Sequence, residues 1–274
     1  MKKLIVIADW ASDSLASQEA LSAIEGYLKD RSGRIITFVS STPSTIHSAF
    51  LLQQIVEVEE KYGEPLETVI FQYTDPRLHS NDGLKQADGA KPLIVRLKSG
   101  MYLNGPNAGN NFSLIKNRIE EVFEYKGLNT QGQFHSRDLY ARLTAHLMDE
   151  MEDELELEEV SSNLIPPLEG FYVGHIDNFG NIKTLIPHSY FKGKFEIGDE
   201  VTLTINDVTK KAKYVENLFG GEPGELVIYR GSSGKLDDRY LEVTIWRQFT
   251  EKNPTTGVHA FNHPKPGMEI IIKT

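Results

Sequence analysis

Residues that could take part in chemistry stand at the ends of predicted strands. Asp9 and Asp13 follow the apolar run at residues 4–8. Open α/β sheets bind ligands outside the carboxyl ends of their strands, and a carboxylate there can accept hydrogen bonds from both vicinal hydroxyls of a ribose. The same position also suits the cap of a following helix. Asp9 is therefore predicted either to bind a nucleoside or to begin a helix.

A denser polar cluster follows the third predicted strand. It contains Asp75, Arg77, His79 and Asp82, all within eight residues. An acid, a guanidinium and an imidazole together suit catalysis, although a surface turn built around Asp-Pro has the same composition. The segment is predicted to be a catalytic loop or a plain turn. A different hydrolase, using His79 or Asp82, is a further alternative.

His135 and Ser136 stand where another helix is predicted to begin. Helix starts offer free N–H groups and the positive end of the helix dipole. Ser136 is a suitable cap for that helix. The imidazole of His135 would either orient a nucleophile or complete a local hydrogen-bond network.

Two polar turns occur in the second half. Asp177, Phe179 and Asn181 directly follow a strand-like segment, in a pattern typical of a hairpin turn. The sequence YRGSSGKLDD, which includes Ser232 and Ser233, could cradle a carboxylate through backbone N–H and hydroxyl groups, although Gly-Ser loops are common.

Several familiar sites are missing from the sequence. It contains no Walker sequence, GxGxxG, HExxH or GxSxG motif. It also contains no cysteine, which excludes thiolate metal sites and cysteine nucleophiles. The two histidines of the 250–267 segment are expected at the surface rather than on a metal, so no metal site is predicted. The sequence does not say whether this segment covers a site or extends the second domain.

In the first half of the sequence, predicted strands alternate with predicted helices, and these elements must position the residues named above. Strand-like runs occupy residues 4–8, 34–39, 68–72 and 92–97, and helical patterns occupy 14–28, 45–60 and 113–125. Buried strands separated by helices predict a mainly parallel sheet. A further helix is predicted over 136–156, where apolar residues recur every four positions. Its end is acidic, with eight acids among residues 149–159, and is expected to be a solvated helix face or linker.

The pattern changes after SSNLIPPLEG, whose prolines and glycine stop helices. Short β-branched or aromatic segments follow at 171–176, 181–186, 201–205, 225–229 and 240–246. They predict an antiparallel β-sandwich or small barrel. The fold class is therefore α/β, with a mainly parallel α/β sandwich domain over residues 1–160 and a smaller antiparallel β domain over 161–274.

Composition narrows the expected partners. With 39% hydrophobic and 25% charged residues among 274, the chain resembles an ordinary folded protein. A net charge of -10 disfavours binding to phosphate backbones, so nucleic acid is not an expected partner. The apolar run in MKKLIVIADW is too short for a secretory signal or a membrane span. We therefore expect a cytoplasmic protein with no membrane association.

Taken in order, these segments resemble the S-adenosyl-L-methionine (SAM) hydroxide adenosyltransferase family, or SAM hydrolases, which share their fold with the fluorinase and chlorinase enzymes. The sequence IDNFGN at 176–181 is similar to the family's I-D-x-F-G-N, and IADWASD at 7–13 to its T-D-F-G-x-x-D. QFHSRDLYARLTAHL at 133–147 resembles T-F-H-G-R-D-I-F-A-P-x-A-A-x-L. Weaker similarities are TPSTIHSAFLL after the second strand, TDPR for V-D-P-G-V-G-T-x-R, NGPNAGN for G-P-D-N-G, and GSSG before YLEVTIW for N-S-x-G-x-L-E-I-A. The resemblance spans nearly the whole chain.

The resemblance implies a reaction and an assembly. Water or hydroxide would attack the ribose C5′ of SAM, giving adenosine and methionine without a cofactor. The protein would be a homotrimer, with each site between the N-terminal domain of one subunit and the C-terminal domain of its neighbour. Carried over, substrate-binding roles fall on Asp9 for the ribose, Phe179 and Asn181 for the adenosine portion, Asp177 for the methionine ammonium, and Ser232, with Ser233 beside it, for the polar end of methionine.

The family's catalytic Asp-Arg-His set would fall on Asp75 and His135, with Arg77 as a nearby substitute for the arginine. The family's arginine lies seven residues beyond its aspartate, a place that Asp82 occupies here, and the intervening glycines are missing. Ser136 replaces the hydrolases' glycine and matches a serine that halogenating relatives use near their halide, so it is expected at the substrate. The retained His135 favours hydrolysis over halogenation. The alternative is a member of the same fold that binds SAM or adenosine without turnover, or serves a structural role.

Overall fold

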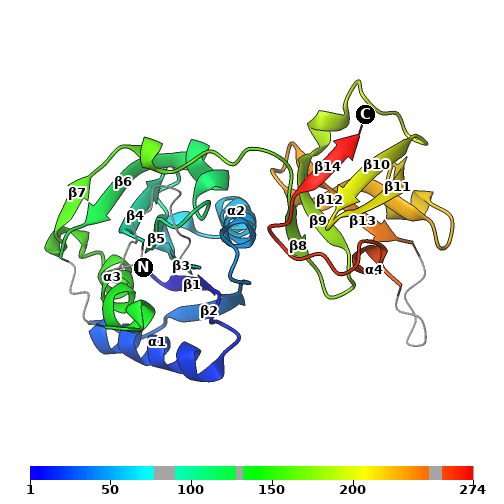
Figure 1. Ribbon diagram of the computed structural model, residues 1–274. Helices are drawn as coiled ribbons and strands as arrows, with labels where there is room; N and C mark the ends of the chain where they lie inside the picture. Colours follow the sequence, from blue (N-terminus) through cyan, green and yellow to red (C-terminus); the bar gives the residue numbers. More distant parts are fainter. Residues whose placement is uncertain (77–89, 128–131, 247–254, 274) are drawn as a thin grey trace, which may run out of the picture. The chain divides into compact units, whose positions relative to one another are not determined.

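The computed structural model describes residues 1–76, 90–127, 132–246 and 255–273 (Figure 1). The chain divides into two compact units, Met1–Leu168 and Glu169–Thr274. Each unit has its own sheet and its own apolar core. None of the helices formed by the described residues is long and apolar enough to cross a membrane.

The first unit is built on a sheet whose order is β2-β1-β3-β5-β4-β6-β7 over the described residues. Strands β2, β1, β3 and β5 pair in parallel, whereas β4 runs antiparallel to β5 and β6, and β7 antiparallel to β6. The parallel arrangement therefore holds for one half of the sheet. The strands are β1 (Lys3–Ala8), β2 (Ile35–Ser40), β3 (Thr68–Tyr73), β4 (Pro92–Leu97), β5 (Tyr102–Pro106), β6 (Ile119–Tyr125) and β7 (Leu157–Glu159).

Helices cover both faces of this sheet, which confirms the α/β class. Helices α1 (Ser14–Tyr27) and α3 (Ala141–Met148) pack against each other on one face, and α2 (Thr45–Tyr62) packs on the other (Figure 1). Alternate residues of a strand point to opposite faces. Accordingly Leu4 and Val6 of β1 join the core beneath α1 and α3, whereas Ile5 and Ile7 join the core beneath α2.

The prediction of a helix over residues 113–125 is wrong. A 3₁₀ turn, η2 (Ser113–Arg118), is followed by β6, in which Val122 pairs with Val95 of β4. The apolar spacing of Ile115, Ile119 and Val122 is that of a helix, but the register shift opposite Leu97 lets Ile119 and Val122 join one core from a strand. Pairing with β4 decides between them, because β-branched residues pack well on a sheet.

The helix predicted over 136–156 ends early, at Met148. The Asp149 carboxylate contacts Arg34 at 2.5 Å and accepts from the backbone N–H of Lys29, and Glu150 adopts a left-handed φ of 56°. The acidic run is therefore neither a helix face nor a linker. It forms a 3₁₀ turn, η4 (Glu152–Glu154), and the edge strand β7. A charged edge strand discourages pairing with other chains.

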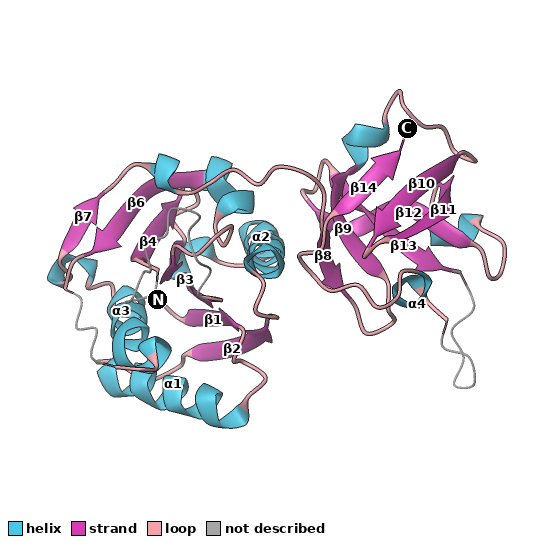
Figure 2. Ribbon diagram, viewed as in Figure 1, coloured by secondary structure: helices cyan, strands magenta, loops and turns pink. Residues whose placement is uncertain are grey.

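The second unit is a curled sheet with the order β14-β10-β11-β12-β13-β9-β8 (Figure 2). Its pairings are antiparallel except for β11 with β12, so the predicted antiparallel β domain is confirmed with one parallel pair. Its elements are β8 (Val173–Ile176), β9 (Ile182–Pro187), β10 (Glu200–Ile205), β11 (Val208–Val215), β12 (Leu226–Gly234), β13 (Arg239–Ile245), the short helix α4 (Gly257–Ala260) and β14 (Ile270–Lys273). The remaining single turns of the chain are η1 (Pro65–Glu67), η3 (Ser136–Tyr140), η5 (Ser162–Leu164), η6 (His188–Phe191) and η7 (Leu218–Gly220).

Candidate functional site

Asp9 directly follows β1 at the carboxyl edge of the first sheet. Its backbone N–H donates to the carbonyl of Tyr73, the last residue of β3, at 3.2 Å. Helix α1 is capped instead by Asp13, whose Oδ1 accepts from the backbone N–H groups of Leu15 at 2.9 Å and Ala16 at 3.3 Å. The Asp9 side chain is therefore not needed to begin the helix.

The surroundings of Asp9 disfavour its charge. Burial raises the pKa of Asp9 to about 6, and the negative charge of Asp75 adds to the rise, while the backbone N–H groups of Asp9 and Trp10 oppose it. A partly buried acid with a shifted pKa, at the edge where α/β sheets bind ligands, is a candidate for function. It would gain from a ligand that brings hydrogen-bond donors.

An aromatic cluster lies beside Asp9. The indole of Trp10 lies 6.4 Å from the ring of Phe38, 6.4 Å from that of Phe71 and 5.8 Å from that of Phe134. Its Nε1–H donates to Ser136 Oγ at 2.9 Å. Ser136 is fully buried and lies inside η3, a π-helical turn that no side chain caps. The predicted cap is therefore wrong, because the Ser136 hydroxyl holds Trp10 instead.

The first unit brings several predicted residues to one edge of its sheet. Asp75 follows β3, close enough to Asp9 for their charges to interact, and its Oδ2 accepts from the backbone N–H of Ala90 at 3.1 Å. Ser136 is linked to the same edge through Trp10, and half-buried His135 precedes it. Arg77 lies outside the described residues, as do His79 and Asp82.

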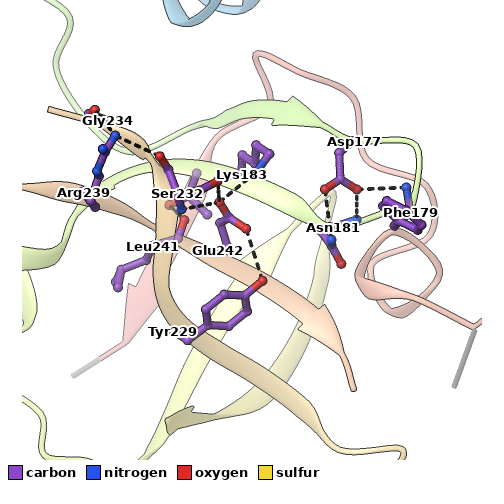
Figure 3. Close-up of polar contacts among 11 residues, drawn as sticks. Asp177, Phe179, Asn181, Lys183, Tyr229, Ser232, Gly234, Arg239, Leu241 and Glu242 are labelled. Atoms are coloured by element: carbon purple, nitrogen blue, oxygen red, sulfur yellow. Dashed lines mark hydrogen bonds and ion pairs between the residues drawn. The ribbon is translucent and has the colours of Figure 1, made fainter. Parts of the chain in front are cut away.

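In the second unit, Asp177 builds the turn between β8 and β9 (Figure 3). Its Oδ1 accepts from the backbone N–H groups of Phe179 and Asn181, both at 3.0 Å, and its Oδ2 accepts from Asn181 Nδ2 at 3.0 Å. The hairpin turn inferred from the sequence is thus present. It leaves the ring of Phe179 66% exposed. An exposed aromatic ring on a braced turn is suited to stacking against a flat ligand.

Ser232 and Ser233 lie in an irregular part of β12. The register with β13 shifts between Arg230 and Gly234, and Ser232 is exposed there, whereas Ser233 is buried. The Oγ of Ser233 has no hydrogen-bond partner in the part of the chain that the structure describes. The nearby Arg239 Nη1 donates to the carbonyls of Ser232 at 2.9 Å and Gly234 at 3.1 Å (Figure 3).

Beneath Ser232 lies Glu242, a buried acid in the middle of β13 (Figure 3). Its Oε1 accepts from the backbone N–H of Ser232 at 2.8 Å, from Ser232 Oγ at 3.1 Å and from Lys183 Nζ at 2.8 Å. Its Oε2 accepts from the hydroxyl of Tyr229 at 3.2 Å. Both donors of Ser232 are used inside the protein. Its hydroxyl also accepts from Lys183 Nζ at 3.2 Å, which leaves one lone pair for a ligand donor.

Sequence reasoning missed several residues of these two clusters. Glu242 had the clearest signal, because an acid inside the apolar run YLEVTIW must find partners when it is buried. Trp10 and Lys183 gave no such signal, since their contacts come from distant parts of the chain. Within the described ranges, no group of three or more acidic or histidine side chains is arranged to hold a metal ion.

Solved structures share this two-part architecture. The chain is similar to an uncharacterized conserved protein from Thermotoga maritima, at 19% identity and a TM-score of 0.72, over 98% of this chain and 100% of that one. It is also similar to a conserved hypothetical protein from Thermus thermophilus, at 16% identity and a TM-score of 0.64, over the full length of both. At such identities the likeness defines the class of fold, an α/β unit followed by a β unit.

One family model matches part of the second unit. Residues 171–237 match the family described as the SAM hydroxide adenosyltransferase C-terminal domain. The match includes both the Asp177 turn and the irregular strand that carries Ser232. This match over part of the second unit supports a relation to the SAM hydroxide adenosyltransferase family, a family of SAM-utilizing enzymes. Among curated proteins there is no match.

Proposed function

We propose that the chain is a SAM hydrolase, which releases adenosine and L-methionine by attack of water or hydroxide at the ribose C5′. The observation that carries the proposal is the family match over the turn that holds Asp177, Phe179 and Asn181. The acid Asp9, at the carboxyl edge of the first sheet, supports it. A carboxylate there is suited to accept the two ribose hydroxyls.

The chemistry demands little from the protein beyond alignment. The bond from the water oxygen to C5′ forms while the C5′–S bond breaks, and the sulfonium leaves as the neutral thioether of methionine. No proton is needed on the leaving group, and the proton lost from water passes to Asp75 or His135. Rate enhancement then comes from holding a small nucleophile in line with the C5′–S bond and excluding other water. The reaction as proposed needs no cofactor.

The remaining groups bind and orient the substrate. Phe179 would stack on the adenine, and Asn181 would hydrogen-bond the adenosine portion. Asp177 would accept from the methionine ammonium, and Ser232 would contact the polar end of methionine. Ser136 would act through Trp10, which it holds at 2.9 Å. Arg77 is kept as the candidate guanidinium of the site.

The proposed assembly is a homotrimer in the cytoplasm. The family resemblance predicts that the Asp9 cluster of one subunit and the Asp177 cluster of a neighbour form one site. SAM and adenosine are its ligands in this proposal, and nucleic acid and membranes are not partners.

Incubation of the purified protein with SAM, followed by chromatography of the products, tests the reaction. Equal amounts of adenosine and methionine should appear. His135→Ala and Asp75→Asn should abolish their release, whereas His146→Ala, a histidine change on the following helix α3, should not. Absence of adenosine at high protein concentration would contradict the proposal.

A second candidate is a SAM- or adenosine-binding protein without turnover. It is favoured by one sequence observation, that Asp82 stands where the family has its catalytic arginine. Calorimetry separates the two candidates. Binding of SAM or adenosine without product release, abolished by Asp9→Ala, would support the second.

A further inference from the structure

Tyr140 and Asn104 are two of several buried residues in the first unit with a polar atom that has no partner among the described residues. Tyr140 is 2% exposed and Asn104 is fully buried. Neither the hydroxyl of Tyr140 nor the Nδ2 of Asn104 has a hydrogen-bond partner in the described part of the chain. Buried polar groups are nearly always satisfied by protein or by ordered water, so each unpaired group calls for an explanation.

The two groups belong to the same face of the sheet. Asn104 of β5 is the register partner of Phe71 of β3, and the ring of Tyr140 stacks on Phe71 with a centroid distance of 5.7 Å and an interplanar angle of 19°. The single hydroxyl proton of Thr144 is shared between the carbonyl of Tyr140 at 2.8 Å and Asn104 Oδ1 at 3.2 Å. Phe71 and Thr144 therefore connect Tyr140 and Asn104 from two sides.

The side chain of Tyr140 lies near Asp75. The ring of Tyr73, the last residue of β3, meets that of Tyr140 edge-on at 5.4 Å and 78°, and Asp75 follows two residues later. Burial raises the pKa of Tyr140 well above its ordinary value, and the charges of Tyr73 and Asp75 add to the rise. The hydroxyl therefore keeps its proton at neutral pH and can donate a hydrogen bond beside a carboxylate.

Two hydroxyls at this place, those of Tyr140 and Thr144, are absent from the family motif that residues 133–147 resemble. In T-F-H-G-R-D-I-F-A-P-x-A-A-x-L, phenylalanine stands in the place of Tyr140 and alanine in the place of Thr144. The same chain lacks the family's arginine seven residues after Asp75. Tyr140 is also the last residue of the π-helical turn η3, a form that concentrates at functional sites.

We propose that Asn104 and Tyr140 form a small polar site that binds the water molecule which Asp75 activates. The inference rests on the proposed function. The amide N–H of Asn104 and the hydroxyl of Tyr140 donate to the water oxygen in the resting site. One of these two bonds is released as that lone pair forms the O–C5′ bond, the C5′–S bond breaks, and the Asp75 carboxylate accepts the proton. A buried water typically makes two to four such bonds. Asn104 and Tyr140 thus supply two donors that hold the water beside Asp75.

Crystal structures of the wild-type protein and of Tyr140→Phe test the site directly. Phenylalanine keeps the ring packed on Phe71 and removes only the hydroxyl. The wild type should show one water within hydrogen-bond distance of both Tyr140 Oη and Asn104 Nδ2, and the variant should lose it. A wild-type structure without this water overturns the proposal.

Kinetics test what the water does. In Tyr140→Phe and Asn104→Leu we expect kcat for adenosine release to fall by about tenfold or more, with KM within about twofold, because the groups act on the nucleophile and not on SAM. Tyr125→Phe, which removes the hydroxyl of another tyrosine in the same core, should leave both constants unchanged. Unchanged kcat in Tyr140→Phe would overturn the proposal. If the wild type held the water but released no adenosine, the proposed function would fail while the water site stood.

Discussion

Asp9 is held in a place where its charge is costly. The backbone at Asp9 is tied to the end of β3, and its carboxylate is partly buried near a second acid, Asp75. Protein groups alone do not offset the burial, which is why the pKa stays raised. A ribose would supply two hydroxyl donors to the carboxylate. The cost in the free protein is thus consistent with a binding role.

The unfavourable burial of the Asp9 charge predicts how the stability of the protein depends on pH. The pKa of Asp9 rises from 3.8 in the unfolded chain to about 6 in the folded protein, so the folded state binds the proton more tightly and stability falls as the pH rises between these values. At pH 8, Asp9→Asn should raise the free energy of unfolding by about 1–2 kcal/mol, a figure reduced for partial exposure. Urea denaturation at pH 8 and below pH 3.8 measures it. An equal gain at both pH values would contradict the explanation.

The raised pKa of Asp9 also predicts how ligand binding depends on pH. Only the ionised carboxylate accepts from both ribose hydroxyls, so adenosine affinity should fall as the pH drops through about 6. Titration calorimetry with adenosine from pH 8 to pH 5 tests this. Asp9→Asn should bind weakly at every pH. A wild-type affinity that did not change over this range would remove Asp9 from the site.

Glu242 organises the second cluster, and its removal should be costly. Glu242→Gln keeps the shape but leaves Lys183, whose side chain is 17% exposed, without its carboxylate. We expect a loss of about 2–3 kcal/mol in the free energy of unfolding. Glu200→Gln is the matched control, since it breaks the exposed pair with Lys211 in the same unit and should change little. Similar losses in both variants, measured by urea denaturation, would argue against this role for Glu242.

At the scale of elements, turns and irregular strands place the candidate residues. The π-helical turn η3 follows His135 and holds Ser136 against Trp10. The shift in β12 exposes Ser232 and buries Ser233, although the sequence treats them alike. The β8–β9 turn is braced by Asp177 and closed by Gly180, which has a φ of +75°. Each of these features lies at the end of a helix or strand, or where a strand is interrupted.

The Asp177 turn depends on glycine at position 180 for two reasons. Its φ is left-handed, and a Cβ there would overlap Thr256 Oγ1. Gly193 has a similar φ of +73°, but a Cβ at that position would meet nothing within 4 Å, so Gly193→Ala carries the backbone strain alone. Gly180→Ala should therefore cost about 1–2 kcal/mol more than Gly193→Ala, and should weaken adenosine binding. Equal losses of stability by thermal denaturation would show that the contact with Thr256 is unimportant.

At the scale of the whole molecule, the candidate residues divide between two units. Asp9, Asp75, His135 and Ser136 belong to Met1–Leu168, whereas the Asp177 turn and the Ser232 strand belong to Glu169–Thr274. The proposed function needs groups from both. A shared site of this kind makes assembly a condition of activity.

Light scattering of the purified protein checks the predicted assembly. A homotrimer should have three times the mass of the single chain. Mixing inactive Asp75→Asn with binding-impaired Asp177→Ala should restore part of the activity, because mixed trimers contain some sites with two intact halves. A monomer with full SAM hydrolase activity would contradict a site between subunits.

The sequence alone determined those features that depend on local pattern. The period of apolar residues predicts α1, α2 and the buried strands, and the prolines after the acidic run mark the change to β structure. IDNFGN predicts a turn and lies within the region that the family model matches. The tertiary structure decided what depends on distant partners. Pairing with β4 makes residues 119–125 a strand, and the Arg34 contact with Asp149 accompanies the early end of α3. Trp10 Nε1–H donates to the Ser136 hydroxyl, and the Glu242 carboxylate accepts from four donors. Short-range spacing cannot reveal such contacts, because a hydrogen bond or a ladder partner is chosen by what the folded chain brings near.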